Sequence, residues 1–138
     1  MDDETLRQAL IGARNIAVVG LSDRPSRPSY GVARYLKEQG YRIIPVNPNI
    51  TEVLGEKAYP DLTSVPDAID LVDIFRRSSQ VGPVVDEAIT KGVQTIWMQL
   101  GIVDEAAAAR ARAAGITVIM NRCTLIEHRR LVGEQRSR

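Results

Sequence analysis

Two arginines stand in a polar loop that follows an apolar run, a pattern typical of an anion-binding site. Residues 16–19 are apolar, Gly20 ends the run, and Arg24 and Arg27 follow before a predicted helix. Guanidinium groups bind phosphates through paired, charge-assisted hydrogen bonds, and a helix N-terminus adds unpaired N–H groups and a positive dipole. The stretch therefore predicts a phosphate site made by a strand, a loop and a helix, with Ser29 as the N-cap.

The single histidine and the single cysteine do not predict a catalytic pair. Cys123 and His128 are five residues apart, a spacing that places two helical side chains well over a third of a turn away from each other. A metal site is also not expected, because each of these ligand types occurs once. We therefore assign no catalytic residue and no metal ligand.

Composition limits the classes of partner. The 138 residues are 44% hydrophobic, enough for one domain, and the formal net charge of +1 gives no broad basic surface for a nucleic acid. No apolar run approaches the roughly 20 residues of a membrane span. The acidic start and the single cysteine predict a cytoplasmic monomer or small homo-oligomer without an internal disulfide.

Apolar runs alternate with amphipathic segments along the chain, which predicts an α/β fold with a doubly wound, mostly parallel sheet in one domain. Strands are expected at residues 16–19, 42–46, 69–75, 93–100 and 116–120, with a brief edge strand at 57–59. Helices are expected at 3–13, 29–39, 79–91, 104–114 and 124–132, with a turn at 61–65 capped by Asp61. The core is expected over residues 14–132, ahead of a polar tail at 133–138.

In such a sheet, ligands bind at the carboxyl ends of the strands, beside the switch point, here predicted between the first strand and the strand ending near Phe75. Polar and basic residues gather at the predicted strand ends. Of the neighbours Arg76 and Arg77, only one can face a ligand, and Arg76 is the better candidate. Trp97 and Met98 lie within an apolar strand, which favours the core.

The ends of the first two strands argue against NAD. A dinucleotide fingerprint requires G-x-G-x-x-G after the first strand and an acid after the second. Gly31 is the next glycine after Gly20, and the second strand ends in Val46-Asn47-Pro48. Arginines suit a nucleotide with an additional phosphate, which leaves NADP or coenzyme A (CoA).

Five segments resemble the small bacterial CoA-binding domain proteins. They are Gly20 to Tyr30, Val46-Asn47-Pro48, Val72 to Arg76, Trp97 to Gly101, and Asn121-Arg122-Cys123. The resemblance covers about residues 11–131 and extends to the N-terminal, CoA-binding part of the succinyl-CoA synthetase alpha subunit. It implies a Rossmann-like sheet with CoA held across the strand ends, and it implies no reaction.

The resemblance also implies roles for the residues. The loop from Gly20 to Ser29 would hold the CoA phosphates, Asn47 and Pro48 would border the adenosine, and Gln99 to Gly101 would face the pantetheine arm. The complete expected site is Gly20, Leu21, Ser22, Arg24, Arg27, Pro28, Ser29, Tyr30, Asn47, Pro48, Phe75, Arg76, Gln99, Leu100, Gly101, Asn121, Arg122 and Cys123.

Two departures from these relatives stand out. The synthetase loop is shorter and rich in glycine, whereas this one carries arginines and prolines. Ile50 occupies the place of a synthetase lysine, and Asn121 stands where aspartate is common in the small proteins.

The leading hypothesis is non-catalytic binding of CoA or an acyl-CoA. The alternatives are an NADP-dependent enzyme and a partner module of an acyl-CoA ligase. Cys123 is expected near a helix N-terminus and near the ligand crevice, so a mixed disulfide with the CoA thiol is a further hypothesis.

Overall fold

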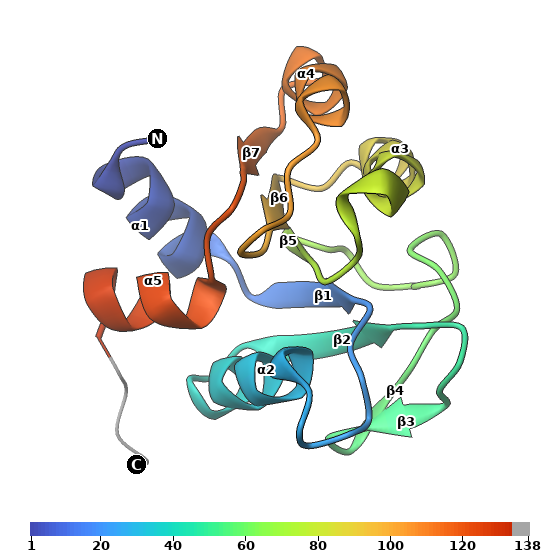
Figure 1. Ribbon diagram of the computed structural model, residues 1–138. Coiled ribbons are helices and arrows are strands. Elements are labelled where there is room, and N and C mark those ends of the chain that lie inside the picture. Colours follow the sequence, from blue (N-terminus) through green and yellow to red (C-terminus); the bar gives the residue numbers. More distant parts are fainter. Residues whose placement is uncertain (134–138) are drawn as a thin grey trace.

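A five-stranded parallel sheet forms the centre of the molecule, and helices cover both of its faces (Figure 1). The computed structural model describes residues 1–133, so most of the predicted polar tail lies outside the described residues. The strands, in spatial order, are β2 (Arg42–Val46), β1 (Asn15–Val19), β5 (Leu71–Ile74), β6 (Thr95–Met98) and β7 (Thr117–Ile119). The predicted doubly wound α/β fold is confirmed.

Two hydrophobic clusters fix which helix covers which face. Helices α1 (Asp3–Gly12), α2 (Pro28–Glu38) and α5 (Thr124–Leu131) pack on one face, where Ile16 and Val18 of β1 point. Helices α3 (Val81–Lys91) and α4 (Glu105–Ala113) cover the other face, where Ala17 and Val19 point. Each central strand is therefore buried on both sides, which explains its uninterrupted apolar sequence.

The strand order places the switch point between β1 and β5, as predicted. The chain moves from β1 to β2 on one side and then returns to β5 on the other side of β1. Trp97, in β6, is fully buried, and its Nε1 donates to the Arg122 carbonyl oxygen at 2.8 Å. The prediction that Trp97 and Met98 belong to the core is confirmed.

The predicted edge strand at 57–59 is confirmed only at Tyr59, which forms an isolated parallel bridge with Val46 at the edge of the main sheet. Lys57 instead belongs to a separate hairpin. Residues Glu52–Val53 (β3) and Glu56–Lys57 (β4) form an antiparallel hairpin outside the main sheet. Its two-residue turn has positive φ at Leu54 (55°) and Gly55 (75°), the geometry of a tight hairpin turn. Leucine rarely adopts this conformation, so the residue types gave no turn signal.

The predicted N-cap at Ser29 is also wrong, because α2 begins one residue earlier. Pro28 is the first helical residue, a position that suits its fixed φ, and Arg27 is the N-cap without a side-chain hydrogen bond. Helix α3 begins at Val81, after a 3₁₀ turn at Ser78–Gln80, rather than at residue 79. The capped turn is confirmed, since Asp61 Oδ1 accepts from the Ser64 backbone N–H at 2.8 Å.

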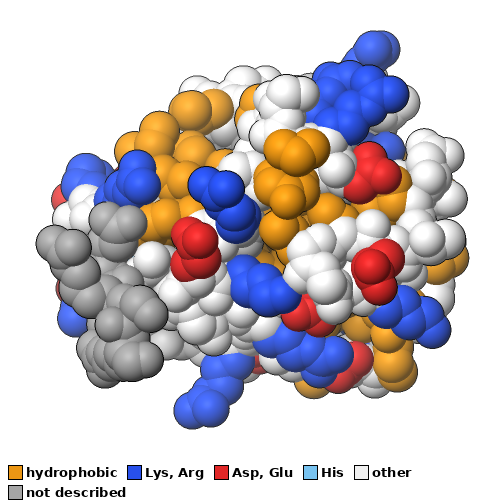
Figure 2. Space-filling view, turned by 90° about the horizontal axis from the view of Figure 1, so that it is seen from below, with side chains coloured by type: hydrophobic (Ala, Val, Ile, Leu, Met, Phe, Trp, Pro, Cys, Tyr) orange, Lys and Arg blue, Asp and Glu red, His pale blue; other side chains and the backbone are white. Residues whose placement is uncertain are grey.

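Charge is mixed on the face seen in Figure 2. Lys and Arg side chains stand among Asp and Glu side chains and hydrophobic patches on that face. None of the helices within residues 1–133 is long and apolar enough to cross a membrane.

Gly20 brings the ends of β1 and β5 together. Its φ is +87°, and a Cβ placed there would lie 2.2 Å from the Phe75 carbonyl oxygen. Backbone bonds hold the junction on both sides, from Gly20 N to the Val46 oxygen and from Phe75 N to the Val19 oxygen, each 2.8 Å long. Only glycine fits this position without displacement of the backbone.

A buried polar cluster joins β5, β6 and α5. Asp73 is completely buried, and its Oδ2 accepts from Thr124 Oγ1 at 2.9 Å and from Gln99 Nε2 at 3.2 Å. Among the described residues, its Oδ1 has no hydrogen-bond partner. Burial raises the pKa of Asp73 to about 7, while the hydrogen bonds from Thr124 and Gln99 act in the opposite direction.

Replacing Gly20 with alanine should lower the free energy of unfolding by at least about 2 kcal/mol, because the new Cβ meets backbone and the φ is strained. Urea denaturation measures the loss. Gly12→Ala is the control, since no atom lies within 4 Å of its Cβ position. Equal stability of the two variants would contradict the proposed close approach.

The stability of the protein should fall as the pH rises from 5 to 8. The folded Asp73 keeps its proton up to about pH 7, whereas in the unfolded chain it ionises near pH 4. The free energy of unfolding therefore falls as the pH rises from the unfolded pKa to the folded pKa, because only the unfolded chain releases the proton in that range. The decrease should be about 3 kcal/mol in urea denaturation, and Asp73→Asn should flatten it. An unchanged slope in the variant would assign the pH dependence to other groups.

Candidate ligand-binding site

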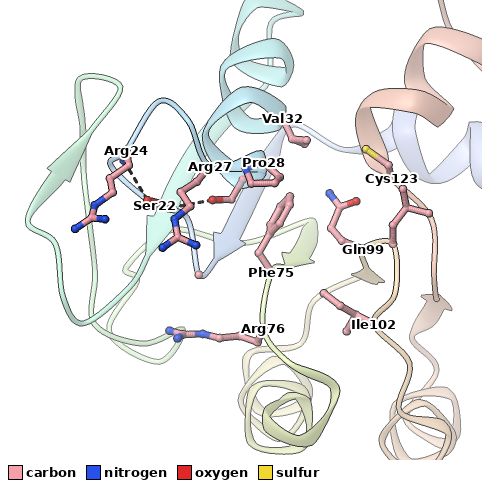
Figure 3. Close-up of a pocket in the computed structure, with 13 residues that line it drawn as sticks. Ser22, Arg24, Arg27, Pro28, Val32, Phe75, Arg76, Gln99, Ile102 and Cys123 are labelled. Carbon is pink, nitrogen blue, oxygen red and sulfur yellow. Dashed lines mark hydrogen bonds between the residues drawn. The ribbon is translucent and has the colours of Figure 1, made fainter.

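A pocket of about 660 Å³ opens at the carboxyl ends of β1, β5 and β6, beside the switch point (Figure 3). The loop after β1, the first turns of α2, the segments after β5 and β6, and the start of α5 contribute its walls. The lining residues are Gly20, Ser22, Arg24, Arg27, Pro28, Ser29, Val32, Phe75, Arg76, Gln99, Leu100, Ile102 and Cys123.

The loop after β1 is folded by its own serines. Ser22 Oγ accepts from the Arg24 backbone N–H at 3.0 Å, and the Ser22 N–H donates to Ser29 Oγ at 3.0 Å (Figure 3). A further backbone bond joins Arg27 N to the Arg24 oxygen at 3.0 Å. Ser29 thus fastens the loop to the start of α2 rather than capping the helix. The loop therefore fixes the positions from which both arginine side chains extend.

Three guanidinium groups gather on one side of the pocket (Figure 3). Arg24 and Arg27 are exposed and Arg76 is half-buried. Within residues 1–133, none of the three has an acidic partner. Ion pairs do occupy many arginines elsewhere, namely Arg7, Arg42, Arg110, Arg122 and Arg130. The pocket therefore presents cations that the protein itself does not neutralise.

The other side of the pocket is apolar and structurally fixed. The ring of Phe75 lies in the middle of the site, with Gln99, Ile102 and Cys123 beyond it (Figure 3). Gln99 is 4% exposed. Its amide is fixed in place because its Nε2 donates to Asp73 Oδ2 and to Thr124 Oγ1. Its Oε1 accepts from the Thr124 N–H at 3.1 Å. The start of α5 is thereby anchored to β6.

Cys123 is the N-cap of α5 and lies partly exposed in the pocket wall. His128 is 2% exposed, and its Nδ1 lies 2.7 Å from the Tyr35 hydroxyl oxygen. It does not line the pocket. Within residues 1–133, no three His, Cys, Asp or Glu side chains gather as metal ligands would. The cysteine thus faces the pocket, whereas the histidine packs between helices.

The structure brings eleven of the expected site residues to the pocket. They are Gly20, Ser22, Arg24, Arg27, Pro28, Ser29, Phe75, Arg76, Gln99, Leu100 and Cys123. Arg76 lines the pocket and Arg77 does not, in agreement with the choice between the two neighbours.

Seven expected residues do not line the pocket. Leu21 is buried in the core, Tyr30 packs against that core, and Pro48 is exposed. Asn47 fixes a neighbouring loop, because its Nδ2 donates to the Leu21 oxygen at 3.0 Å and its Oδ1 accepts from the Asn49 N–H at 2.9 Å.

The remaining three support loops behind the wall. Asn121 Oδ1 accepts from the Gly101 N–H at 2.7 Å, and Asn121 itself has a positive φ of 58°. Arg122 pairs with Glu127 across 3.6 Å. Gly101, Asn121 and Arg122 are therefore not among the lining residues.

The sequence prediction missed Val32 and Ile102, which complete the apolar wall. Val32 follows Ser29 by three residues in α2, so helical spacing places the two side chains on the same face. That spacing was a usable signal. Ile102 follows a loop glycine, outside any helix or strand, so no hydrophobic periodicity could predict which way its side chain points.

Comparisons with known proteins identify the family of the chain. Residues 14–129 match the CoA binding domain family. The uncharacterized protein YneT of Bacillus subtilis is 42% identical over 123 residues, which make up 89% of this chain and 91% of that protein. The alpha subunit of ADP-forming acetate–CoA ligase II from Pyrococcus furiosus is 38% identical over 84 residues. That match covers 60% of this chain but 18% of the subunit, so the chain corresponds to a small part of the ligase.

Solved structures share the whole fold. A hypothetical protein from Pyrococcus horikoshii has a TM-score of 0.94 at 40% identity, covering 96% of this chain and 94% of that one. A Thermus thermophilus protein has a TM-score of 0.90 at 39% identity, covering 95% and 99%. With the family match over residues 14–129 and a relative that aligns over nearly its full length, the chain belongs to the CoA-binding domain family.

Proposed function

We propose that the protein binds CoA or an acyl-CoA in the switch-point pocket and performs no reaction on it. The observation that carries the proposal is the group of three unpaired guanidinium groups at one end of an otherwise uncharged pocket. CoA matches this arrangement, because it has phosphates at its nucleotide end and an uncharged pantetheine arm. Membership of the CoA-binding domain family supports the same ligand.

The proposed ligand lies across the strand ends. Its phosphates contact Arg24, Arg27 and Arg76, and its pantetheine arm passes Phe75 toward Gln99. Charge-assisted bonds from planar guanidinium groups supply affinity at the phosphate end, and burial against the aromatic ring supplies it along the arm.

The lining residues support binding without catalysis. Within residues 1–133 they include no His, Asp, Glu or Lys, so this part of the wall supplies no ordinary general acid or base. Among the lining residues of the described chain, Cys123 is the one that commonly acts as a strong nucleophile.

Replacing both Arg24 and Arg27 with alanine should weaken CoA binding by about 2 to 4 kcal/mol, because each loses a charge-assisted contact of roughly 1.5 to 3 kcal/mol with some non-additivity. Isothermal titration calorimetry measures the change. Arg14→Ala combined with Arg77→Ala is the matched control, since both residues are exposed and neither lines the pocket. A similar loss in both double variants would mean that overall charge, not the pocket, determines affinity.

The same titration tests the NADP alternative. Binding of NADP without binding of CoA would contradict the proposal and favour an oxidoreductase-like role. A partner-module role rests on the ligase similarity, in which the chain matches 12% of the Archaeoglobus fulgidus acetate–CoA ligase II and 18% of the Pyrococcus furiosus subunit. Co-purification of the chain with a ligase-like protein would support that role.

Cys123 should form a mixed disulfide when the protein is exposed to CoA disulfide. The thiolate attacks one sulfur of the reagent, the Cys123–CoA disulfide forms, and one CoA thiol leaves, so no other oxidant is required. Intact-mass measurement should find an adduct of one CoA that a thiol reductant removes. Cys123→Ser and treatment with acetyl-CoA, which has no free thiol, are the controls. No adduct on the unchanged protein would show that the ligand sulfur does not approach Cys123.

A further inference from the structure

The pocket has two ends of opposite character (Figure 3). The guanidinium groups of Arg24 and Arg27 lie at one end, and Ile102 and Cys123 lie at the other. The Arg76 side chain extends toward the arginine end and away from Ile102. Since the sulfur of CoA is at the opposite end of the molecule from the nucleotide, phosphates bound by the arginines direct the sulfur toward the apolar end.

The segment after β6, which carries Ile102, exposes large hydrophobic side chains. Leu100 lines the pocket and is 58% exposed, and Val103 is 40% exposed. Two of the five exposed large hydrophobic side chains within residues 1–133 therefore stand three positions apart in this segment, and Leu100 lines the pocket. Apolar surface that continues a ligand pocket is a candidate for further contact with the ligand.

Among the described residues, no charged side chain lines the apolar end. The charged lining residues within 1–133 are the three arginines, and their side chains gather at the other end (Figure 3). A carboxylate brought to Leu100 and Ile102 would face apolar side chains and gain no cation. A methylene group brought there gains affinity, by about fourfold when fully buried.

We infer that the apolar end, formed by Val32, Phe75, Leu100 and Ile102, receives the acyl group of an acyl-CoA derived from a short, uncharged monocarboxylic acid. This inference rests on the proposed function and specifies its ligand class. Free CoA leaves the exposed side chain of Leu100 without a partner, and a dicarboxylic acyl group places a charge against it.

Affinities for CoA, acetyl-CoA, butyryl-CoA and succinyl-CoA, measured by calorimetry under reducing conditions, test the inference. Butyryl and succinyl groups have four carbons each and differ in the terminal carboxylate. Butyryl-CoA should bind at least about fourfold more tightly than acetyl-CoA, the equivalent of one fully buried methylene. Succinyl-CoA should bind no more tightly than acetyl-CoA. Chromatography of the recovered ligands verifies that the thioesters stay intact.

The variant Leu100→Ser should bring the ratio of butyryl-CoA to acetyl-CoA affinity close to one, and any effect on the shared CoA portion cancels in this ratio. Ile11→Ser is the control, since Ile11 is an exposed hydrophobic residue of α1 outside the pocket, and the ratio should not change. Equal affinities for acetyl-CoA and butyryl-CoA, or succinyl-CoA as the tightest ligand, would overturn the inference alone. Failure of all four compounds to bind would instead overturn the proposed function, and the inference with it.

Discussion

The contact of Gly20 with the Phe75 carbonyl group is the constraint on which the site depends. A backbone approach that excludes a Cβ brings the ends of β1 and β5 together at the switch point. The connections that leave these strands run to opposite faces of the sheet, so space opens just beyond the contact. Arg24 and Arg27 reach this space from one connection, and Arg76 reaches it from the other. Arg76 therefore lies near Arg24 and Arg27 in space, although about 50 residues separate it from them in sequence.

Most of the fold was predictable, because each central strand is buried on both faces and each helix has one apolar stripe. Burial on two faces gives uninterrupted apolar runs such as residues 16–19, and covering helices show three-to-four-residue periodicity. The hairpin at residues 52–57 was not predictable in this way, since its strands have two residues each and its turn uses Leu54 at positive φ. The start of α2 shows a competition between two signals, in which Pro28 at the first position outweighed a serine cap.

The site was predictable in part, because a strand order assigns loops to an edge but does not give the direction of each side chain. Charge and alternation sufficed for Arg76, whose neighbour Arg77 does not line the pocket. The same reasoning could not predict that Gln99 lines the pocket while Asn121 does not. The Asn121 side-chain oxygen instead accepts a hydrogen bond from the backbone N–H of Gly101. The complete burial of the Asp73 carboxyl was not predictable either. In the sequence, an acid within an apolar strand looks the same whether it is exposed at an edge or covered by a helix.

The hydrogen bonds of Gln99 leave its side chain able to accept one more hydrogen bond but not to donate one. Both N–H groups of its amide are already donated, to Asp73 and Thr124, and its oxygen accepts one bond from Thr124. A carbonyl oxygen can accept two bonds, so what the side chain still offers is one lone pair. An amide N–H of a bound molecule can use it, whereas an amide oxygen in the same place finds no donor on this side chain. Amide N–H and C=O groups are therefore not interchangeable at Gln99.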